Sequence, residues 1–149
     1  MKVILQRVTG AAVIVADKVV GKIEQGALLL VGVTHNDAFE QADWMARKIA
    51  SLRVFRAAEG PSHFERSLLD IGGAVLVVSQ FTLYGDARKG RRPDFSQAAR
   101  PAVAAPLIDY FCNKLRAEGL TVETGIFGAD MRVELANDGP VTIILDSPE

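Results

Sequence analysis

Residues that could do chemistry follow directly after the apolar run of residues 74–78, in the sequence Ser79, Gln80, Phe81, Thr82. Polar side chains at the end of a buried strand need hydrogen-bond partners, so they satisfy either turn amides or a ligand. Ser79 and Thr82 are possible nucleophiles, but neither has an obvious histidine base, because His35 and His63 lie in separate loops. A site built on backbone amide donors that stabilise an oxyanion is the remaining catalytic reading.

The second chemical candidate is residues 137–142, Asn137-Asp138-Gly139-Pro140-Val141-Thr142, which precede the apolar run 143–145. Proline removes a backbone donor and fixes φ, so Gly139-Pro140 predicts a boundary ahead of a strand. Glycine before proline also leaves backbone carbonyls uncovered, which suits close approach of another molecule to the main chain. An ordinary turn is the alternative, since only about 5–6% of X-Pro bonds in folded proteins are cis.

A cluster of cations occupies a single predicted loop, at Arg88, Lys89, Arg91 and Arg92. The formal net charge of the chain is only −1, so contact with a polyanion would depend on a local patch such as this one. A solvated loop without a ligand is the alternative. One cysteine excludes an internal disulfide framework, and two scattered histidines give no metal-ligand spacing, so we expect no metal.

Several function classes lack their sequence signals. No glycine-rich nucleotide-binding loop and no Gly-x-Ser-x-Gly sequence is present, which argues against a nucleotide cofactor and an ordinary serine hydrolase. With 149 residues, 49% of them hydrophobic, we expect one domain spanning residues 1–149. No apolar run approaches the roughly 18 residues of a membrane span, and the N-terminal run is too short for a signal peptide, so we expect a soluble, cytoplasmic protein.

The elements that must position these residues are strands interrupted by two helices. β-branched residues in 3–15 and 19–23 predict an antiparallel hairpin. Uninterrupted apolar runs in residues 27–33 and 74–78 predict strands that are buried on both faces. Alternation in two later segments, residues 121–124 and 131–135, predicts half-exposed strands.

Apolar residues at spacings of three and four predict a helix over residues 39–49, capped by Asn36 or Asp37. Ser96 is the expected cap of a second helix, in which Pro106 is an irregularity and Cys112 is a small core residue. Together these elements predict an α/β fold: a single compact domain with two β-sheet layers, barrel-like, and helices packed on one side.

The two chemical stretches together resemble the paired signature of the D-aminoacyl-tRNA deacylase family, historically D-tyrosyl-tRNA deacylase. Residues 79–83 and 137–142 stand in the family's order, far apart in the chain. Similarity also extends over nearly the whole sequence, at residues 6–8, 30–33, 91–96 and 127–131.

The resemblance implies a homodimer without metal or cofactor that hydrolyses the ester joining a D-amino acid, or glycine, to the 3′-terminal adenosine of tRNA. Gly139-Pro140 would be cis and enter the partner's site, where its carbonyls exclude an L side chain. The Phe81 and Thr82 amides would bind the oxyanion, and the ribose 2′-hydroxyl of the substrate would take part in catalysis. The expected catalytic residues are Ser79, Gln80, Phe81 and Thr82; the expected substrate-binding residues are Phe127, Met131, Asn137, Gly139, Pro140 and Thr142; the expected tRNA-binding residues are Arg7, Arg88, Lys89, Arg91 and Arg92.

The chain departs from the family pattern in residues 60–66, where many members carry Lys-Met-Asn after the glycine, and at Gly128, where alanine is common. The first departure leaves the contacts of that loop open; the second should alter little. Three alternatives remain: a related achiral-type aminoacyl-tRNA deacylase with a trans Gly-Pro bond, a non-catalytic tRNA-binding module, and an esterase of free small esters.

Overall fold

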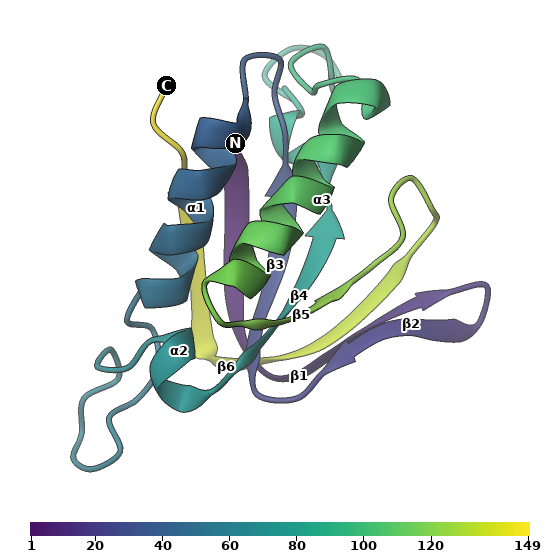
Figure 1. Ribbon diagram of the computed structural model, residues 1–149. Helices are drawn as coiled ribbons and strands as arrows, with labels where there is room; N and C mark the ends of the chain where they lie inside the picture. The colour runs from purple at the N-terminus through teal and green to yellow at the C-terminus, as the bar shows by residue number, and fades with distance from the viewer.

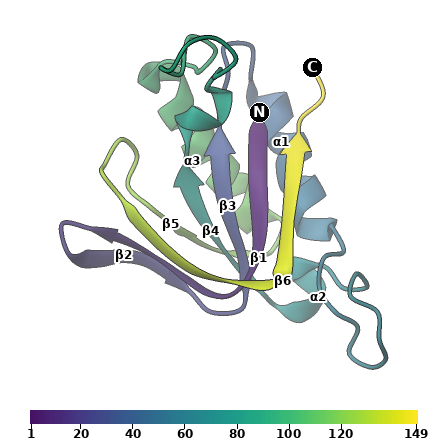
Figure 2. The same ribbon diagram turned by 180° about the vertical axis from the view of Figure 1, so that it is seen from behind.

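Six strands form one continuous, strongly curved sheet in the computed structural model, which describes residues 1–149 (Figure 1 and Figure 2). The strand order is β2-β1-β3-β4-β5, and β6 pairs with the edge of β1 that faces away from β3. Gly21 of β2 approaches the Thr124 carbonyl of β5 so closely that a Cβ at Gly21 would lie 2.5 Å from that oxygen. The sheet is therefore nearly closed and barrel-like, as expected. The strands are β1 (Lys2–Val15), β2 (Lys18–Ile23), β3 (Gly26–Gly32), β4 (Ala74–Ser79), β5 (Thr121–Thr124) and β6 (Arg132–Asp146).

The central strands β3 and β4 run parallel, and almost every residue of both is buried, as their apolar sequences predict. Their register pairs Gly26 with Ala74 at one end and Val31 with Ser79 at the other. Glycine is required at position 26, because a Cβ there would lie 1.8 Å from the Ala74 carbonyl oxygen. This close contact fixes the register that places Ser79 beside the end of β3.

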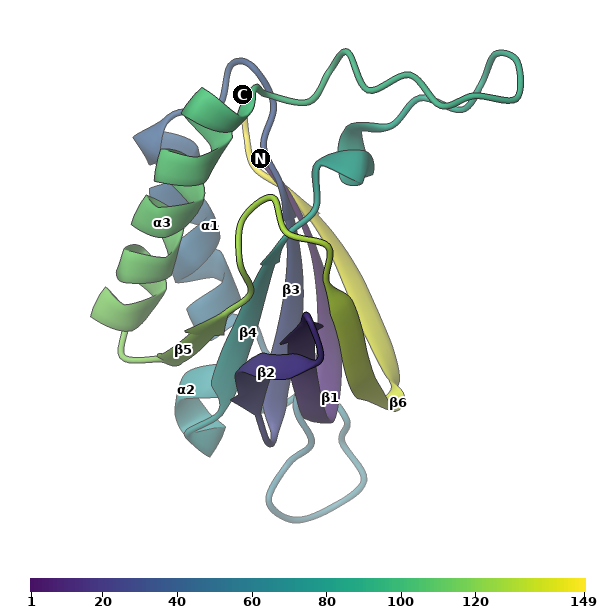
Figure 3. The same cartoon turned by 90° about the vertical axis from the view of Figure 1, so that its right-hand side faces the viewer.

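Two helices, α1 (Phe39–Ser51) and α3 (Pro101–Ala117), cover one face of the sheet (Figure 1 and Figure 3). Their apolar faces pack with the sheet into a core of 28 buried residues. A second core of seven buried residues, which includes Val13, Ile23 and Leu76, lies inside the curve of the sheet, so the two predicted layers are two parts of one sheet. Cys112 belongs to the larger core, where burial raises the pKa of its thiol to about 11.

The start of α1 differs from the prediction. Its N-cap is Ala38 and not Asn36 or Asp37. The Asp37 carboxylate instead accepts a 2.8 Å hydrogen bond from the Thr34 N–H, which holds the turn before the helix. A short helix α2 (Leu68–Ile71) and a 3-10 helix η1 (Phe81–Tyr84) complete the fold.

The start of α3 also lies later than predicted, at Pro101 and not after Ser96. Arg100 takes an extended conformation (φ −64°, ψ 152°), as residues before proline tend to do, and proline is favoured at the first helical position. The Ser96 hydroxyl and N–H bind the Asp94 carboxylate instead of capping the helix. The helix continues through Pro106, which lies on its exposed side.

Gly139-Pro140 does not mark the start of a strand, so the predicted boundary was wrong. β6 pairs with β1 on both sides of this dipeptide, with Val8 opposite Asn137 and Gln6 opposite Thr142. Four residues, 138–141, therefore face the single residue Arg7 and form a bulge. The bulge interrupts the ladder without ending the strand.

Candidate functional site

A cavity of about 580 Å³ opens at the carboxyl ends of β3 and β4, beside the start of α3 and the loop that follows β5. Openings at this edge of parallel strands are common ligand sites. Its lining is mostly hydrophobic, and it includes five of the residues predicted for the site: Ser79, Gln80, Phe81, Phe127 and Met131.

The end of β4 places the predicted catalytic residues at the cavity. The last ladder bond runs from the Gln80 N–H to the Val31 carbonyl, at 2.8 Å. After it Gln80 leaves the strand conformation (φ −143°, ψ 78°) and the chain turns into η1. The Phe81 and Thr82 N–H groups stand at the start of this 3-10 helix, where no acceptor within the helix is available to them. Two backbone donors are thus available next to the cavity.

Side chains at and just before the start of η1 contact one another beside the cavity. The Gln80 side-chain amide donates a hydrogen bond to the Thr82 hydroxyl. Thr82 itself does not line the cavity, and its side chain is exposed. The Phe81 ring, 58% exposed, packs edge-on against Phe95 with ring centroids 5.2 Å apart. An exposed aromatic pair at a cavity mouth can stack on a flat ligand group such as a base.

Neither histidine lines the cavity. The His35 ring is bonded through Nε2 to the Ser96 carbonyl at 2.7 Å, and the His63 backbone belongs to the loop of residues 54–66. Arg100 is the one charged residue in the lining. No group of three or more His, Cys, Asp or Glu side chains converges where a metal ion could be held. The cavity therefore offers hydroxyl, amide and guanidinium groups but no imidazole or carboxylate.

The bulge of residues 138–141 presents Gly139 and Pro140 to the outside of the molecule. The peptide bond between them is cis. The Asn137 side-chain amide closes the bulge, because it donates to the Arg7 carbonyl at 2.9 Å and to the Val141 carbonyl at 3.0 Å. The hydrogen bonds of Asn137 thus fix the shape of the bulge that exposes Gly139 and Pro140.

Arg7 supports the bulge from inside the protein, and its prediction as a tRNA-binding residue was wrong. It is 1% exposed and cannot reach a phosphate. Its Nε lies 3.1 Å from both the carbonyl and a carboxylate oxygen of Asp138, and its Nη1 donates to the Val54 carbonyl at 2.7 Å. A buried guanidinium needs such partners, because an unpaired buried charge is strongly unfavourable.

The other predicted substrate-binding residues of this region are set apart from the cavity. Asn137, Gly139, Pro140 and Thr142 contribute nothing to the cavity lining of their own chain. The Thr142 hydroxyl instead makes long hydrogen bonds, of 3.4 Å each, with the side chains of Gln6 and Asn137. A single chain therefore keeps the two predicted halves of the site separate.

The loop between η1 and α3 projects away from the body of the protein (Figure 3). It carries Arg88, Lys89, Arg91 and Arg92 and is called the basic loop below. Reciprocal backbone bonds between Asp86 and Asp94, of 2.7 and 2.9 Å, close its base. Arg88 is ion-paired with Asp86, and this hydrogen bonding lowers the pKa of the Asp86 carboxyl below its usual range. The remaining three cations, Lys89, Arg91 and Arg92, are exposed and form no ion pair.

Sequence reasoning missed three contributors. Phe95 lies in a stretch already noted for its resemblance, but its contact with Phe81 depends on the folded loop. Arg100 carried no signal beyond its position before a proline. Arg56 binds Asp138 across 82 positions of sequence, and a pairing of that separation has no local signature.

No helix in the structure combines the length and apolar character needed to cross a bilayer.

A family model described as D-Tyr-tRNA(Tyr) deacylase matches residues 4–146. A relative from Chloroflexus aurantiacus named D-aminoacyl-tRNA deacylase is 57% identical over 149 residues, which cover 100% of this chain and 92% of the relative. A relative of the same name from Thermomicrobium roseum is 58% identical, covering 100% of this chain and 96% of the relative. A solved structure named "c-Myc DNA Unwinding Element Binding Protein" matches with a TM-score of 0.92 and 39% identity, covering 100% of both chains.

Proposed function

We propose that this chain, which belongs to the D-Tyr-tRNA(Tyr) deacylase family, hydrolyses the ester bond between a D-amino acid, or glycine, and the 3′-terminal adenosine of mischarged tRNA. The observation that carries this function is the position of residues 79–81 in the lining of the cavity, with Thr82 directly after them at the start of η1. Its volume of about 580 Å³ lies within the range of small-molecule sites and suits an aminoacyl group together with part of its adenosine. The comparisons give no support to the achiral-type enzyme or to a non-catalytic tRNA-binding module.

The chemistry that fits this cavity uses backbone donors. Water attacks the ester carbonyl, and the Phe81 and Thr82 N–H groups stabilise the oxyanion that forms. When the tetrahedral species collapses, the ribose 3′-oxygen leaves with a proton, and a free amino acid and uncharged tRNA are released. The lining supplies no imidazole or carboxylate as a base. This supports a role for the substrate's own 2′-hydroxyl in proton transfer.

Selection against L-amino acids is assigned to Gly139 and Pro140 of the partner subunit. Both residues are exposed, and neither contributes to the cavity of its own chain. Carbonyls placed against the substrate's Cα exclude an L side chain without any group that recognises the D configuration. Glycine, which has only hydrogens there, would be accepted. Charged tRNA is present where translation occurs, which makes the cytoplasm the proposed compartment.

Deacylation of D- and L-tyrosyl-tRNA tests the function directly. We expect D-tyrosyl-tRNA to lose its ester more than roughly 100-fold faster than L-tyrosyl-tRNA. The reason is that Gly139 and Pro140 of the partner subunit, here called the chiral gate, exclude the L side chain by steric overlap. Free D-tyrosine methyl ester is the control, since an esterase of small esters would hydrolyse it equally well. Retention of the ester on both tRNAs, at enzyme concentrations that exceed the substrate, would refute the proposed reaction.

The proposed dimer predicts a species of twice the 16.0 kDa chain mass. A two-fold dimer lets the motif of each chain reach the cavity of the other, which a monomer cannot do. Sedimentation velocity at micromolar protein concentration should give one species of this double mass. A species of 16.0 kDa with full deacylase activity would contradict the shared site.

The basic loop is proposed to bind tRNA phosphates without contributing to the chemistry. Replacing Arg91 and Arg92 together with alanine should weaken tRNA binding, and the slope of log K against log salt should become shallower by about 0.7–0.9 for each phosphate that is no longer neutralised. Lys18→Ala removes an exposed cation from the start of β2 and is the control. A collapse of turnover at saturating tRNA, instead of weaker binding, would place the loop at the reaction centre.

A further inference from the structure

Residues 54–66 form a loop whose base is closed by backbone hydrogen bonds. The Val54 and Phe55 N–H groups both donate to the Arg66 carbonyl, at 3.1 and 2.9 Å, and the Arg66 N–H donates back to the Phe55 carbonyl at 3.0 Å. The Arg66 side chain adds a 2.6 Å bond from Nε to the Arg56 carbonyl. The backbone of Arg56 is therefore fixed at the base of the loop.

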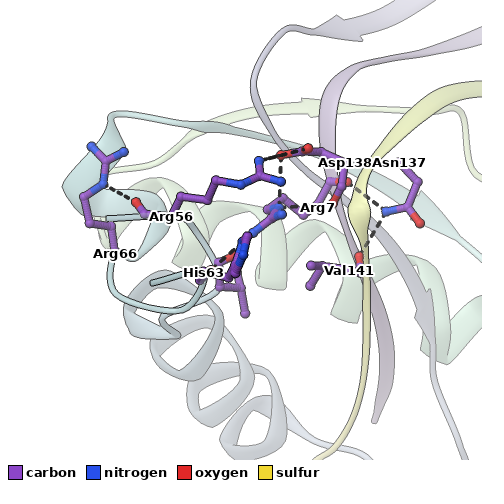
Figure 4. A network of polar contacts seen from close by, with 8 residues as sticks. Arg7, Arg56, His63, Arg66, Asn137, Asp138 and Val141 are labelled. Carbon is purple, nitrogen blue, oxygen red and sulfur yellow. Dashed lines mark hydrogen bonds and ion pairs between the residues drawn. The ribbon is translucent and has the colours of Figure 1, made fainter. Parts of the chain in front are cut away.

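Arg56 extends from this base to the bulge that carries Gly139 and Pro140 (Figure 4). Its Nη1 donates to both carboxylate oxygens of Asp138, at 3.1 and 3.0 Å. The same carboxylate lies 3.1 Å from Nε of Arg7 on its buried side. Asp138 is thus held between two guanidinium groups, one with a side chain 2% exposed and one with a side chain 48% exposed.

We propose that Arg56 is a positioning residue for the chiral gate, acting on Gly139 and Pro140 through the Asp138 carboxylate. The inference rests on the proposed function of those two residues. Gly139 follows Asp138 directly, and no residue between Asn137 and Thr142 has a ladder partner on β1. The direction of the bulge therefore depends on how Asp138 is held. A gate that works by contact tolerates little displacement, since a shift of about 1 Å is enough to change selectivity.

Arg7 alone does not fix the carboxylate. Arg7 binds the Asp138 carbonyl and one carboxylate oxygen from within the protein, and these contacts keep the bulge folded. The opposite side of the carboxylate would face solvent if Arg56 were absent, so the side chain could rotate and the bulge could shift with it. Removal of the Arg56 side chain should therefore loosen the gate without unfolding the protein.

The ion pair between Arg56 and Asp138 also gives the loop of residues 54–66 a role in the site. This loop contains residues 60–66, where the chain departs from the family pattern. Because Arg56 and Arg66 are tied together at its base, the loop sequence can adjust the position of the gate from outside the cavity. Specificity would then depend partly on residues that never touch the substrate.

The test compares Arg56→Ala with Arg56→Lys and with the control Arg53→Ala. Arg53 is exposed in the segment that leads into the loop, so its replacement removes the same charge without touching Asp138. For each variant, kcat and KM are measured with D- and L-tyrosyl-tRNA. In Arg56→Ala we expect the ratio of D to L values of kcat/KM to fall about fivefold, equivalent to about 1 kcal/mol.

The origin of that fall distinguishes positioning from simple loss of structure. A loosened gate raises kcat/KM for the L substrate and leaves KM for the D substrate unchanged, whereas a destabilised protein loses activity on both. Arg56→Lys should recover part of the ratio, and Arg53→Ala should match the wild type. A wild-type ratio in Arg56→Ala, or an equal fall in Arg53→Ala, would overturn the proposal.

Amide hydrogen exchange supplies a readout that does not depend on activity. Peptides covering residues 139–142 should exchange faster in Arg56→Ala than in the wild type or Arg53→Ala, because the bulge opens more often. Unchanged exchange in these peptides would also overturn the proposal. If the wild-type protein fails to hydrolyse D-tyrosyl-tRNA, the proposed function falls, and exchange alone decides whether Arg56 holds the bulge.

Discussion

Gly139→Ala should lower D-aminoacyl-tRNA hydrolysis by about 100-fold or more, because the new methyl group displaces the bulge that we propose forms the gate. A Cβ at this position would lie 2.9 Å from Nη2 of Arg7 and 3.0 Å from Cγ2 of Val141. Arg7 cannot move aside cheaply, since it is buried and bonded to Val54 and Asp138. Gly139 also has φ of +121°, a region in which residues with a Cβ are strained.

Single-turnover deacylation of D-tyrosyl-tRNA measures this fall in activity. Gly72→Ala is the matched control, because Gly72 also has positive φ (+61°) but its Cβ would meet nothing within 4 Å. That variant should lose about 1 kcal/mol of stability and keep its activity. No gain on L-tyrosyl-tRNA is expected for Gly139→Ala, because a displaced and strained bulge would also disturb the position of the substrate ester in the proposed shared site. Wild-type turnover in a folded Gly139→Ala protein would show that the motif does not act at the reaction centre.

Asp138→Ala should reduce the free energy of unfolding by about 3 kcal/mol, since it removes the counterion of a buried cation. Arg7 would keep three backbone carbonyls as partners, those of Val54, His63 and residue 138, but its positive charge would remain in a side chain that is 2% exposed. Removal of one partner from such a pair is far more costly than removal of a surface ion pair, which contributes about 0–1 kcal/mol.

Chemical denaturation at one fixed protein concentration checks this value, because the stability of the proposed dimer would depend on concentration. Asp130→Ala, which removes an exposed carboxylate, should change the free energy of unfolding by less than about 0.5 kcal/mol. Equal stability of Asp138→Ala and wild type would mean that water or another group neutralises Arg7, and the support assigned to the bulge would have to be revised.

The parts of the fold that could be predicted are those set by local sequence. The apolar runs of β3 and β4 and the three-and-four spacing of α1 needed no knowledge of distant residues. The end of β4 was predictable for the same reason, because Ser79 and Gln80 break an apolar run, and the cavity lies there. The resemblance to a family added the pairing of this segment with residues 137–142, which local patterns could not supply.

The bulge could not be predicted, because it results from pairing between β1 and β6 at opposite ends of the chain. Proline normally signals the edge of a strand, and here a bulge with three more residues on β6 than on β1 accommodates it within a strand. Arg7 was assigned to tRNA through the family resemblance, and arginine is rarely buried; only the folded structure places Asp138 and the Val54 carbonyl around it. The predicted helix caps were wrong for a similar reason, since Asp37 bonds to the Thr34 N–H and Ser96 bonds to Asp94 instead of to a helix end.

The separation of the cavity from residues 139 and 140 within one chain has a genetic consequence. In the proposed dimer every site takes its cavity from one copy and its gate from the other. A variant with a blocked cavity and a variant with a disrupted gate would each be inactive as homodimers. A mixed dimer of the two would contain one site in which both the cavity and the gate are intact. Random mixing of equal amounts would restore about a quarter of the wild-type sites. Two alleles that each abolish proofreading could therefore complement one another in the same cell.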